Sequence, residues 1–483
     1  MMIVLAIVAL LAAPEGELEP ANNEELRDYL IEAADRHPQL HARYESWMAA
    51  LERIPQVTSL DDPIFSYTQF IQSDVNQFNA RLTQKFPWFG TRKTRGAREK
   101  SIAESKLHEL YTARNQVLAN VSAAYYDYAY LGEQISVTES QAEILTYTEE
   151  TATAKFALGL AGEVDLLRVQ TEQIQLQDRY ETLQAARQAA SARLALAIGR
   201  SPSEVIPWPT VKTLPSDPPP APVLAARLRT TNPQLRGMDH TIAAAESNLT
   251  LAKKKGYPDI TVGIEYGGIS KPRKVRPERP FPATLNTAYK YGATNRMNTR
   301  TALGQLFAGQ PLTAPTQVPG SRIIDAYTLA NAREPFVTSD GGDDNIGISL
   351  SMNVPIWRGR IRAGVAEAKH RSSAAEHRQI AHGLMLEDRV RLEHFELMDA
   401  KRRHRTVDEQ LVPQAQTTYE SLQSAYASGD TNANFLDVLD SIQTLLVFEL
   451  ERARAFRDAH LAATELNRIL GAFPDIPKPD EDR

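Results

Sequence analysis

The chain of 483 residues contains no cysteine, and this absence excludes several kinds of site. Disulfides, thiol catalysis, cysteine-ligated zinc and lipid attachment at a cysteine all require a thiol. An excess of one charge is also missing, because 54 Lys and Arg accompany 60 Asp and Glu. This balance indicates no polyanionic partner, so we expect no binding to nucleic acid.

Long hydrophobic runs are also absent. Only the segment from Met1 to Ala13 is almost continuously apolar, and it is shorter than the ~20 residues that a membrane-spanning helix needs. The run ends in small residues before Pro14, as the apolar core of a signal peptide does, although no Lys or Arg precedes it. We therefore expect residues 1–14 to be the remnant of a signal peptide. A disordered or buried N-terminal segment is the alternative.

The sequence lacks the common signatures of catalysis. It has neither Gly-x-Gly-x-x-Gly nor Gly-x-Ser-x-Gly. His370, His377 and His382 are seven and five residues apart, whereas a helical metal pair uses spacings of three or four. The Gly-Gly-Asp-Asp segment at 341–344 is interpreted as a solvated loop rather than a calcium site. We therefore predict no enzymatic activity, no metal and no cofactor.

The most informative feature that the chain does have is an internal duplication. Four short landmarks return in the same order at offsets of 195, 268, 270 and 272 residues. The pairs are His37-Pro38-Gln39-Leu40 with Asn232-Pro233-Gln234-Leu235, Lys85-Phe86-Pro87-Trp88-Phe89-Gly90 with Asn353-Val354-Pro355-Ile356-Trp357-Arg358-Gly359, Phe156-Ala157-Leu158-Gly159 with Tyr426-Ala427-Ser428-Gly429, and Ala197-Ile198-Gly199 with Ile469-Leu470-Gly471. The period is too long for a solenoid, so it predicts one architecture made of two similar halves.

Each half contains a very long helical stretch followed by a shorter one. The segments 92–158 and 164–198 form the first pair, and 360–427 and 435–470 form the second. Apolar residues recur every seven positions, in the rows Leu110, Val117, Ala124, Leu131 and Leu107, Val121, Tyr128, Ile135. Heptad spacing favours left-handed pairing of helices. At 1.5 Å per residue the longest helices would reach roughly 100 Å, a length that suits a coiled-coil rod or the wall of a tube.

Two alternating segments precede each long helix. Apolar and polar residues alternate in about 64–88 in the first half and in about 259–267 and 345–357 in the second. A period of two predicts strands with one apolar face. An amphipathic sheet on a soluble core is one interpretation, and a membrane barrel is the other. The helices offer little apolar face to cover a sheet, which favours the barrel. Four strands cannot close a barrel, so the chain must then oligomerise.

Together these motifs resemble those of the TolC, or outer-membrane factor, family of bacterial export ducts. Five sets of residues carry the resemblance. They are the duplicated Pro-Gln-Leu segments, Asp259-Ile260, Val354-Pro355-Ile356-Trp357-Arg358-Gly359, Phe156-x-x-Gly159 with Val164-Asp165-Leu166-Leu167, and Tyr426-x-x-Gly429 with Phe435-Leu436-Asp437-Val438-Leu439-Asp440. The resemblance implies a mainly α protein with a membrane β-barrel portion and duplicated β-β-α-α halves. In a homotrimer, four strands per chain would form a twelve-stranded barrel, and the coiled-coil helices would form an α-barrel.

The resemblance and the duplication predict how the chain is organised. A first repeat covers 24–201, a Pro-rich connector 202–222 and a second repeat 223–473, before a disordered tail at 474–483. The second repeat includes an extracellular loop at 269–344, between its two strands.

The family closes its periplasmic end with the tips of the long helices and with a pair of acids. Carried over, the acid pair falls on Asp437 and Asp440, one turn apart on a helix face. The turn after Gly429 is about two residues longer than in the family, so Asp165 and Asp430 are further candidates to line the pore. Solvated acids at the start of a helix, where the macrodipole favours them, are the alternative interpretation. The tip residues that would contact an adaptor or pump are Gly159, Gly162, Gly429 and Asn432.

The function that the resemblance implies is an exit duct in the outer membrane of a Gram-negative-type bacterium, with its helical part in the periplasm. Its partners would be two further copies of the chain, outer-membrane lipid, a periplasmic adaptor and an inner-membrane pump of the RND or ABC type. Tripartite efflux and type I secretion both fit. The alternative is a coiled-coil scaffold of the cell envelope that forms no channel. The sequence does not identify the cargo.

Overall fold

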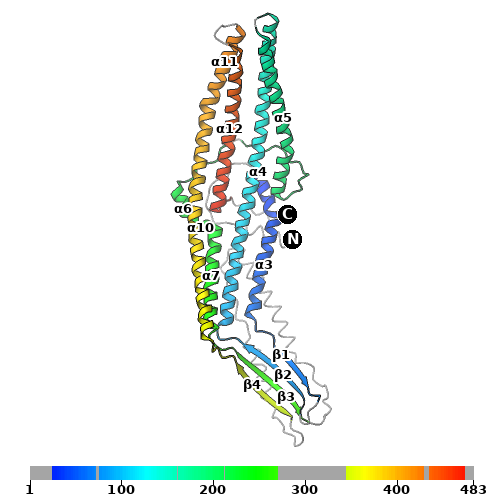
Figure 1. The fold of residues 1–483 in the computed structure, drawn as a ribbon, viewed down its shortest axis with the longest axis vertical. Helices are drawn as coiled ribbons and strands as arrows, with labels where there is room; N and C mark the ends of the chain where they lie inside the picture. Colours follow the sequence, from blue (N-terminus) through cyan, green and yellow to red (C-terminus); the bar gives the residue numbers. More distant parts are fainter. Residues whose placement is uncertain are drawn as a thin grey trace, which may run out of the picture. The chain divides into compact units, whose positions relative to one another are not determined.

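The computed structural model describes residues 24–71, 76–159, 161–211, 213–269, 344–428 and 434–473. The predicted signal peptide at 1–14, residues 270–343 of the predicted loop at 269–344, and the tail at 474–483 lie outside them. Figure 1 shows long helices and one four-stranded sheet, as the predicted fold class requires. Among the described residues, no helix is both long enough and apolar enough to cross a bilayer.

The elements follow the duplicated order. The first half contains α2 (Glu24–Arg36), α3 (Pro38–Thr58), β1 (Ile64–Gln69), β2 (Asn76–Phe86), α4 (Thr91–Ala157) and α5 (Glu163–Ile198). The second half contains α6 (Ala221–Thr231), α7 (Pro233–Lys254), β3 (Ile260–Ile269), β4 (Asn345–Met352), α10 (Arg358–Thr406), the π-helix η1 (Val407–Leu411), α11 (Val412–Ser428) and α12 (Phe435–Leu470). The predicted helices differ from these bounds by at most two residues at each end, apart from η1, which interrupts the second long helix.

The repeated landmarks occupy equivalent places in the two halves. Pro38 and Pro233 each begin a helix, where the missing N–H of proline costs nothing. Gly199 and Gly471 each follow the end of a helix with a left-handed φ, of 96° and 71°. These two pairs of landmarks therefore have equivalent roles at the ends of helices.

The chain divides into two compact units, each with segments from both halves. The first unit takes Met1–Tyr44, His108–Arg236 and Ile380–Arg483, and the second takes Glu45–Leu107 and Gly237–Gln379. These units are defined by contacts between residues, and they differ from the two predicted sequence repeats. The division into repeats stays a prediction.

The heptad rows of α4 form its buried face. The two rows of apolar residues named above are all 8% exposed or less, and Val121 and Tyr128 are fully buried. The same spacing predicts a row on α5, made of Leu176, Leu183, Ala190 and Ala197, but only Leu176 is buried and the other three are half-buried. The buried residues of that helix cluster instead at its C-terminal end, where Leu194 and Ile198 lie.

The second unit carries an antiparallel sheet in the order β1-β2-β3-β4. Its register lines up one row across all four strands: Phe65, Leu82, Ile264 and Ile348. The neighbouring row is Ser66, Arg81, Glu265 and Gly347. Because side chains alternate between faces, one face of the sheet is apolar and the other is polar.

The apolar face is uncovered, with Phe65, Ile348 and Leu350 each at least 65% exposed. On the polar face Glu265 is paired with the guanidinium of Arg81 at 2.7 Å. The strand β4 ends at Met352, five residues before the predicted limit of 357. Pro355 lacks the N–H that a longer ladder would need.

Gly199 offers a test of this local structure. We expect Gly199→Ala to lower the free energy of unfolding by about 1–2 kcal/mol, because an L side chain is strained at positive φ. The new Cβ would also lie 3.4 Å from Cα of His37. The matched variant is Gly159→Ala, which has φ of 74° but no atom within 4 Å of its Cβ. Thermal unfolding followed by circular dichroism should show the larger loss for Gly199→Ala, and an equal loss would contradict this packing.

Candidate functional site

Asp165, Asp437 and Asp440 lie near the starts of α5 and α12, beside the turns that join α4 with α5 and α11 with α12 into two hairpins (Figure 1). In the first hairpin Glu149 of α4 accepts hydrogen bonds from Gln170 at 3.2 Å and Gln173 at 2.9 Å, both on α5. Both turns belong to the first unit. We refer to residues 155–167 and 426–440 as the two hairpin tips.

Asp437 caps its own helix. Its carboxylate accepts the backbone N–H of Asn434 at 3.3 Å, and the side-chain oxygen of Asn434 accepts the N–H of Asp437 at 3.0 Å. This reciprocal pair satisfies two N–H groups that the first turn of a helix leaves free. The helix-start interpretation therefore describes at least part of what Asp437 does.

Asp165 holds the equivalent place in the first tip. Its carboxylate accepts the backbone N–H of Gly162 at 3.4 Å, three residues earlier, as Asp437 does with Asn434. The offset between the two acids is 272 residues, the same as between Gly199 and Gly471. Duplication thus gives each tip one capping acid.

Asp440 has no such structural task. It lies one turn after Asp437 and is exposed, whereas Asp437 is half-buried. Among the described residues, its carboxylate has no hydrogen-bond or ion-pair partner, and only its backbone carbonyl accepts, from the hydroxyl of Thr444 at 2.8 Å. Asp440 is therefore the acid of the pair whose charge is available to a pore.

Lys155 connects the two tips. Its Nζ donates to the backbone carbonyl of Tyr426 and lies 3.9 Å from the centre of the Tyr426 ring. That ring packs 5.6 Å from Phe435, at the start of α12. Burial, and secondarily the charge of Asp165, raises the pKa of Tyr426 above its usual value. The last turn of α4 is thus held against the last turn of α11.

Sequence reasoning used Tyr426 only as a turn landmark and did not identify Lys155. A cation in the last turn of a helix is a weak signal, because it is common there for its interaction with free carbonyls. The partner of Lys155 lies 271 residues away, a contact that no local pattern reveals.

An apolar cluster supports the Lys155–Tyr426 contact. It joins all four helices of the hairpins, through Val169 of α5, Tyr419 of α11, Ile442 of α12 and Leu145 of α4. Each of these side chains is 8% exposed or less. The two hairpins therefore pack as one body near their tips.

The outermost apolar residues of the tips are uncovered. Leu158 is 73% exposed, and the other large apolar side chains in this group are exposed by 42% or more. They are Phe156, Val164, Leu167 and Leu436. Gly159 and Gly162 form the turn between these residues in the first tip, with Gly159 in the left-handed region. Gly429, Asp430 and Asn432 lie outside the described residues.

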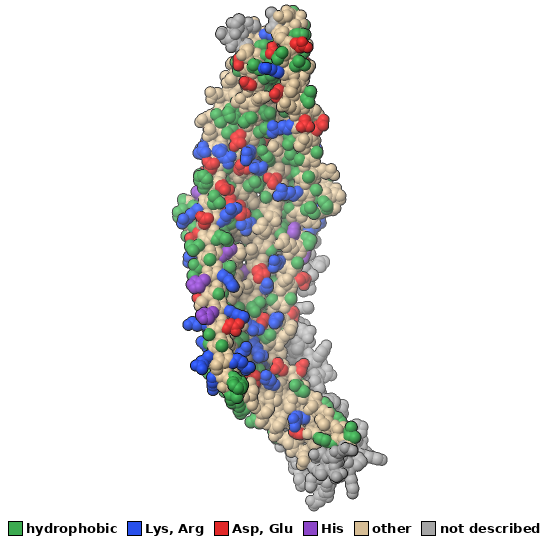
Figure 2. All heavy atoms as spheres, in the orientation of Figure 1, with side chains coloured by type: hydrophobic (Ala, Val, Ile, Leu, Met, Phe, Trp, Pro, Cys, Tyr) green, Lys and Arg blue, Asp and Glu red, His purple; other side chains and the backbone are tan. Residues whose placement is uncertain are grey.

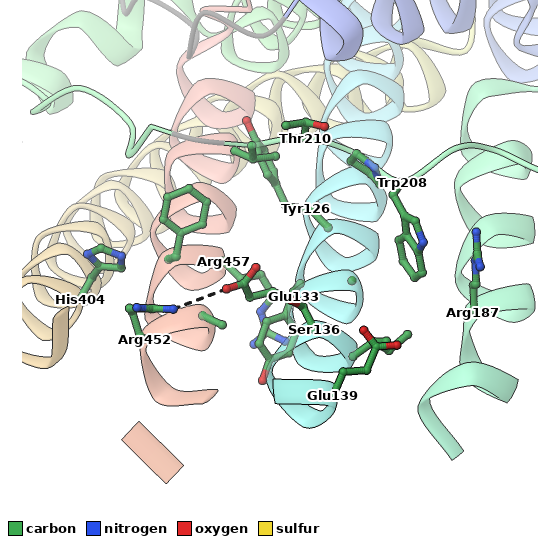
Figure 3. Close-up of a pocket in the computed structure, with 18 of the residues that line it drawn as sticks. Tyr126, Glu133, Ser136, Glu139, Arg187, Trp208, Thr210, His404, Arg452 and Arg457 are labelled. Carbon is green, nitrogen blue, oxygen red and sulfur yellow. Dashed lines mark ion pairs between the residues drawn. The ribbon is translucent and has the colours of Figure 1, made fainter. Parts of the chain in front are cut away.

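A cavity of about 960 Å³ lies elsewhere in the first unit, between α4, α5, α12 and the connector after α5 (Figure 3). In its lining Arg452 lies 3.6 Å from Glu133 and 3.7 Å from Asp408. The guanidinium of Arg187 lies 4.5 Å from the centre of the Trp208 ring.

Trp208 fixes the connector to this cavity. A Cβ at Gly132 would lie 3.1 Å from its ring, so a small residue is needed there. Within the described residues no three His, Asp or Glu side chains are placed to hold a metal. His370 and His377 are exposed, as expected for surface residues, and His382 is half-buried.

Comparison with known proteins identifies the family of one region of the chain. Residues 32–200 match the profile of the outer membrane efflux protein family. That region belongs to the outer membrane efflux proteins. The match confirms the predicted family and the predicted outer-membrane location, with the helical part in the periplasm. A search of curated proteins by sequence finds no match.

Solved structures extend the likeness to the whole fold. The outer-membrane channel OprN superposes with a TM-score of 0.70 at 14% identity, over 97% of this chain and 100% of OprN. VceC from Vibrio cholerae gives 0.68 at 16%, over 93% of this chain and 96% of VceC. The open state of MtrE from Neisseria gonorrhoeae gives 0.63 at 15%, over 92% and 88%. The predicted fold class of an outer membrane efflux protein is therefore confirmed. OprN and MtrE are outer-membrane channels.

Proposed function

We propose that this outer membrane efflux protein acts as a homotrimer, the exit duct of a tripartite efflux system. The observation that carries the proposal is the four-stranded sheet with one uncovered apolar face. The family match supports the general part of this function, an efflux channel of the outer membrane.

The sheet supports assembly into a closed barrel. In the described part of the chain, β1 and β4 each pair on one side only, which leaves two free edges. Unpaired N–H and C=O groups are not tolerated in the hydrocarbon core of a bilayer. Pairing β1 of one protomer with β4 of the next would remove both edges and would put the Arg81–Glu265 face inside.

The tips support a gate and a contact with other proteins. Lys155 and Tyr426 hold the two hairpins together, so their separation offers a way to open the end of the tube. The exposed apolar side chains around Gly159 fit the docking of a periplasmic adaptor or of a pump of the RND or ABC type.

The acids support a cation-attracting constriction. If the tips of three protomers converge, Asp437 and Asp440 contribute six carboxylates around a narrow opening. Asp440 would carry most of this field, because its carboxylate is exposed while that of Asp437 is held by Asn434. Asp165 and Asp430 remain candidates for the narrowest point.

Two measurements on purified protein test the proposal. Light scattering in detergent should give a protein mass near three times 53.7 kDa, and the same material should conduct ions in a planar bilayer. A stable monomer that retains its β content and forms no conductance would instead favour the envelope scaffold. The conductance does not distinguish an efflux system from type I secretion, which needs the cognate pump.

The loop between β3 and β4 should face the outside of the cell. Register places Gly267 opposite Asn345, so the loop leaves the end of the sheet opposite the end where α4 and α10 begin. An epitope tag inserted between positions 269 and 345 should be labelled by antibody on intact cells. The control carries the same tag in the tip at Gly159 and should be labelled only after the outer membrane is permeabilised. The opposite pattern would reverse the topology.

A further inference from the structure

Three junctions between strands and helices lie side by side at one end of the sheet. Register places Phe86, the last residue of β2, opposite Ile260 of β3, which is opposite Met352 of β4. At this end β2 leads into α4, β4 leads into α10, and α7 leads into β3. We call the segments 85–98, 251–260 and 352–366 the collar. All three belong to the second unit.

The collar is strongly basic in a chain whose net charge is −6. Its three segments contain five, three and three Lys or Arg, and Asp259 is the single acid among them. Asp259 is already paired with Lys85 at 3.0 Å. The excess positive charge is therefore local and is not neutralised by the collar itself.

Three arginines at the start of α10 are available for a ligand. Arg358, Arg360 and Arg362 are all exposed, and within the described residues none has an ion-pair partner. They span about 6 Å along the start of α10, at 1.5 Å per residue, after the five residues that connect it to β4. Guanidinium groups bind phosphate with two parallel hydrogen bonds, which suits them to a phosphate ligand.

Aromatic and apolar side chains accompany this charge. Trp357 and Phe89 are 70% and 78% exposed, and Trp88 stacks on Tyr257 with ring centres 5.0 Å apart. Figure 2 shows hydrophobic side chains beside a concentration of Lys and Arg next to the sheet. Trp and Tyr with flanking basic residues are typical of the boundary between hydrocarbon and headgroups.

We propose that the collar is a binding surface for the phosphates of anionic phospholipids in the leaflet that faces the periplasm. The inference rests on the proposed function, because it needs the sheet to lie in the bilayer. Exposed aromatic rings would sit at the level of the headgroups, and Arg358, Arg360 and Arg362 would reach the phosphates beside them. Preference for an anionic lipid follows from the uncompensated positive charge.

Tryptophan fluorescence in vesicles tests the proposal. The full-length protein is reconstituted in phosphatidylcholine with a minor fraction of phosphatidylglycerol, and bromine is placed on the chains of one lipid or the other at equal mole fraction. The signal of Trp357 is obtained by difference from Trp357→Phe. We expect brominated phosphatidylglycerol to quench Trp357 more strongly than brominated phosphatidylcholine, and added salt to reduce the difference.

Two triple variants that lose the same charge test whether the collar arginines cause the preference for phosphatidylglycerol. The triple variant Arg358→Gln, Arg360→Gln, Arg362→Gln should lose the preference for phosphatidylglycerol. The control triple Lys369→Gln, Arg378→Gln, Arg391→Gln removes the same charge from exposed positions further along α10 and should keep it. A preference that survives in the collar variant would overturn the assignment.

The remaining outcomes separate the inference from the proposed function. Equal quenching by the two brominated lipids would refute lipid selection while leaving the sheet in the bilayer. No quenching by either lipid would place Trp357 away from lipid and would count against the membrane position of the sheet. Stronger binding of lipid A than of phosphatidylglycerol would show that the collar prefers a different anionic lipid, in the other leaflet, and would overturn the proposal.

Discussion

Replacing Asp440 by Asn should lower the cation-to-anion permeability ratio of the channel several-fold. The carboxylate of Asp440 is exposed and has no partner among the described residues, so its charge acts on the pore in full. Three copies per trimer would be lost at once. Because exposed substitutions usually change stability by less than about 0.5 kcal/mol, the variant should fold normally. Reversal potentials in salt gradients across planar bilayers measure the ratio.

Matched variants separate charge from structure in this experiment. Asp440→Glu keeps the charge and should keep the selectivity. Asp437→Asn removes an acid that caps α12, so it should combine a smaller change in selectivity with some loss of stability. Unchanged selectivity in well-folded Asp440→Asn would show that this acid is only solvated and would move the constriction to Asp165 or Asp430.

Replacing Lys155 by Ala should open the closed end of the duct. The variant loses the hydrogen bond to the Tyr426 carbonyl and the contact with the Tyr426 ring. A cation–π contact alone contributes about 1 kcal/mol, so three copies shift the closed-to-open equilibrium by about 3 kcal/mol, or roughly 100-fold. Single-channel recordings should therefore show a much larger open probability.

Lys155→Arg is the conservative control, because a guanidinium retains the positive charge and can stack on Tyr426. Its open probability should stay near that of the unsubstituted protein. Tyr426→Leu should behave like Lys155→Ala, since it removes the ring, though not the carbonyl. An open probability that is unchanged in both Lys155→Ala and Tyr426→Leu would show that this contact does not hold the gate.

Local patterns predicted most of the fold because each element repeats a strong signal. The heptad rows of α4 are all buried, and Gly199 ends α5 with the left-handed φ that a helix end favours. Alternation located the strands, although it extended β4 past Met352 by including residues around Pro355.

The gate contact could not be predicted in this way. Lys155 and Tyr426 meet only when two hairpins from different halves of the chain pack together, and no periodicity encodes that pairing. The capping role of Asp437 was one of two readings that the sequence left open. The geometry of Asn434 shows that the cap forms.

Cross-linking of sheet edges tests the central claim, a barrel closed between protomers, most directly. The chain has no native cysteine, so Ser66→Cys on β1 can be combined with Gly347→Cys, Ser349→Cys or Ser351→Cys on β4 in separate variants. Within one chain three strand spacings of ~4.8 Å separate the two edges, too far for a disulfide. Oxidation of outer membranes should link up to three chains in at least one variant on non-reducing gels. Monomers alone in all three variants, with the protein present in the outer membrane, would contradict the account.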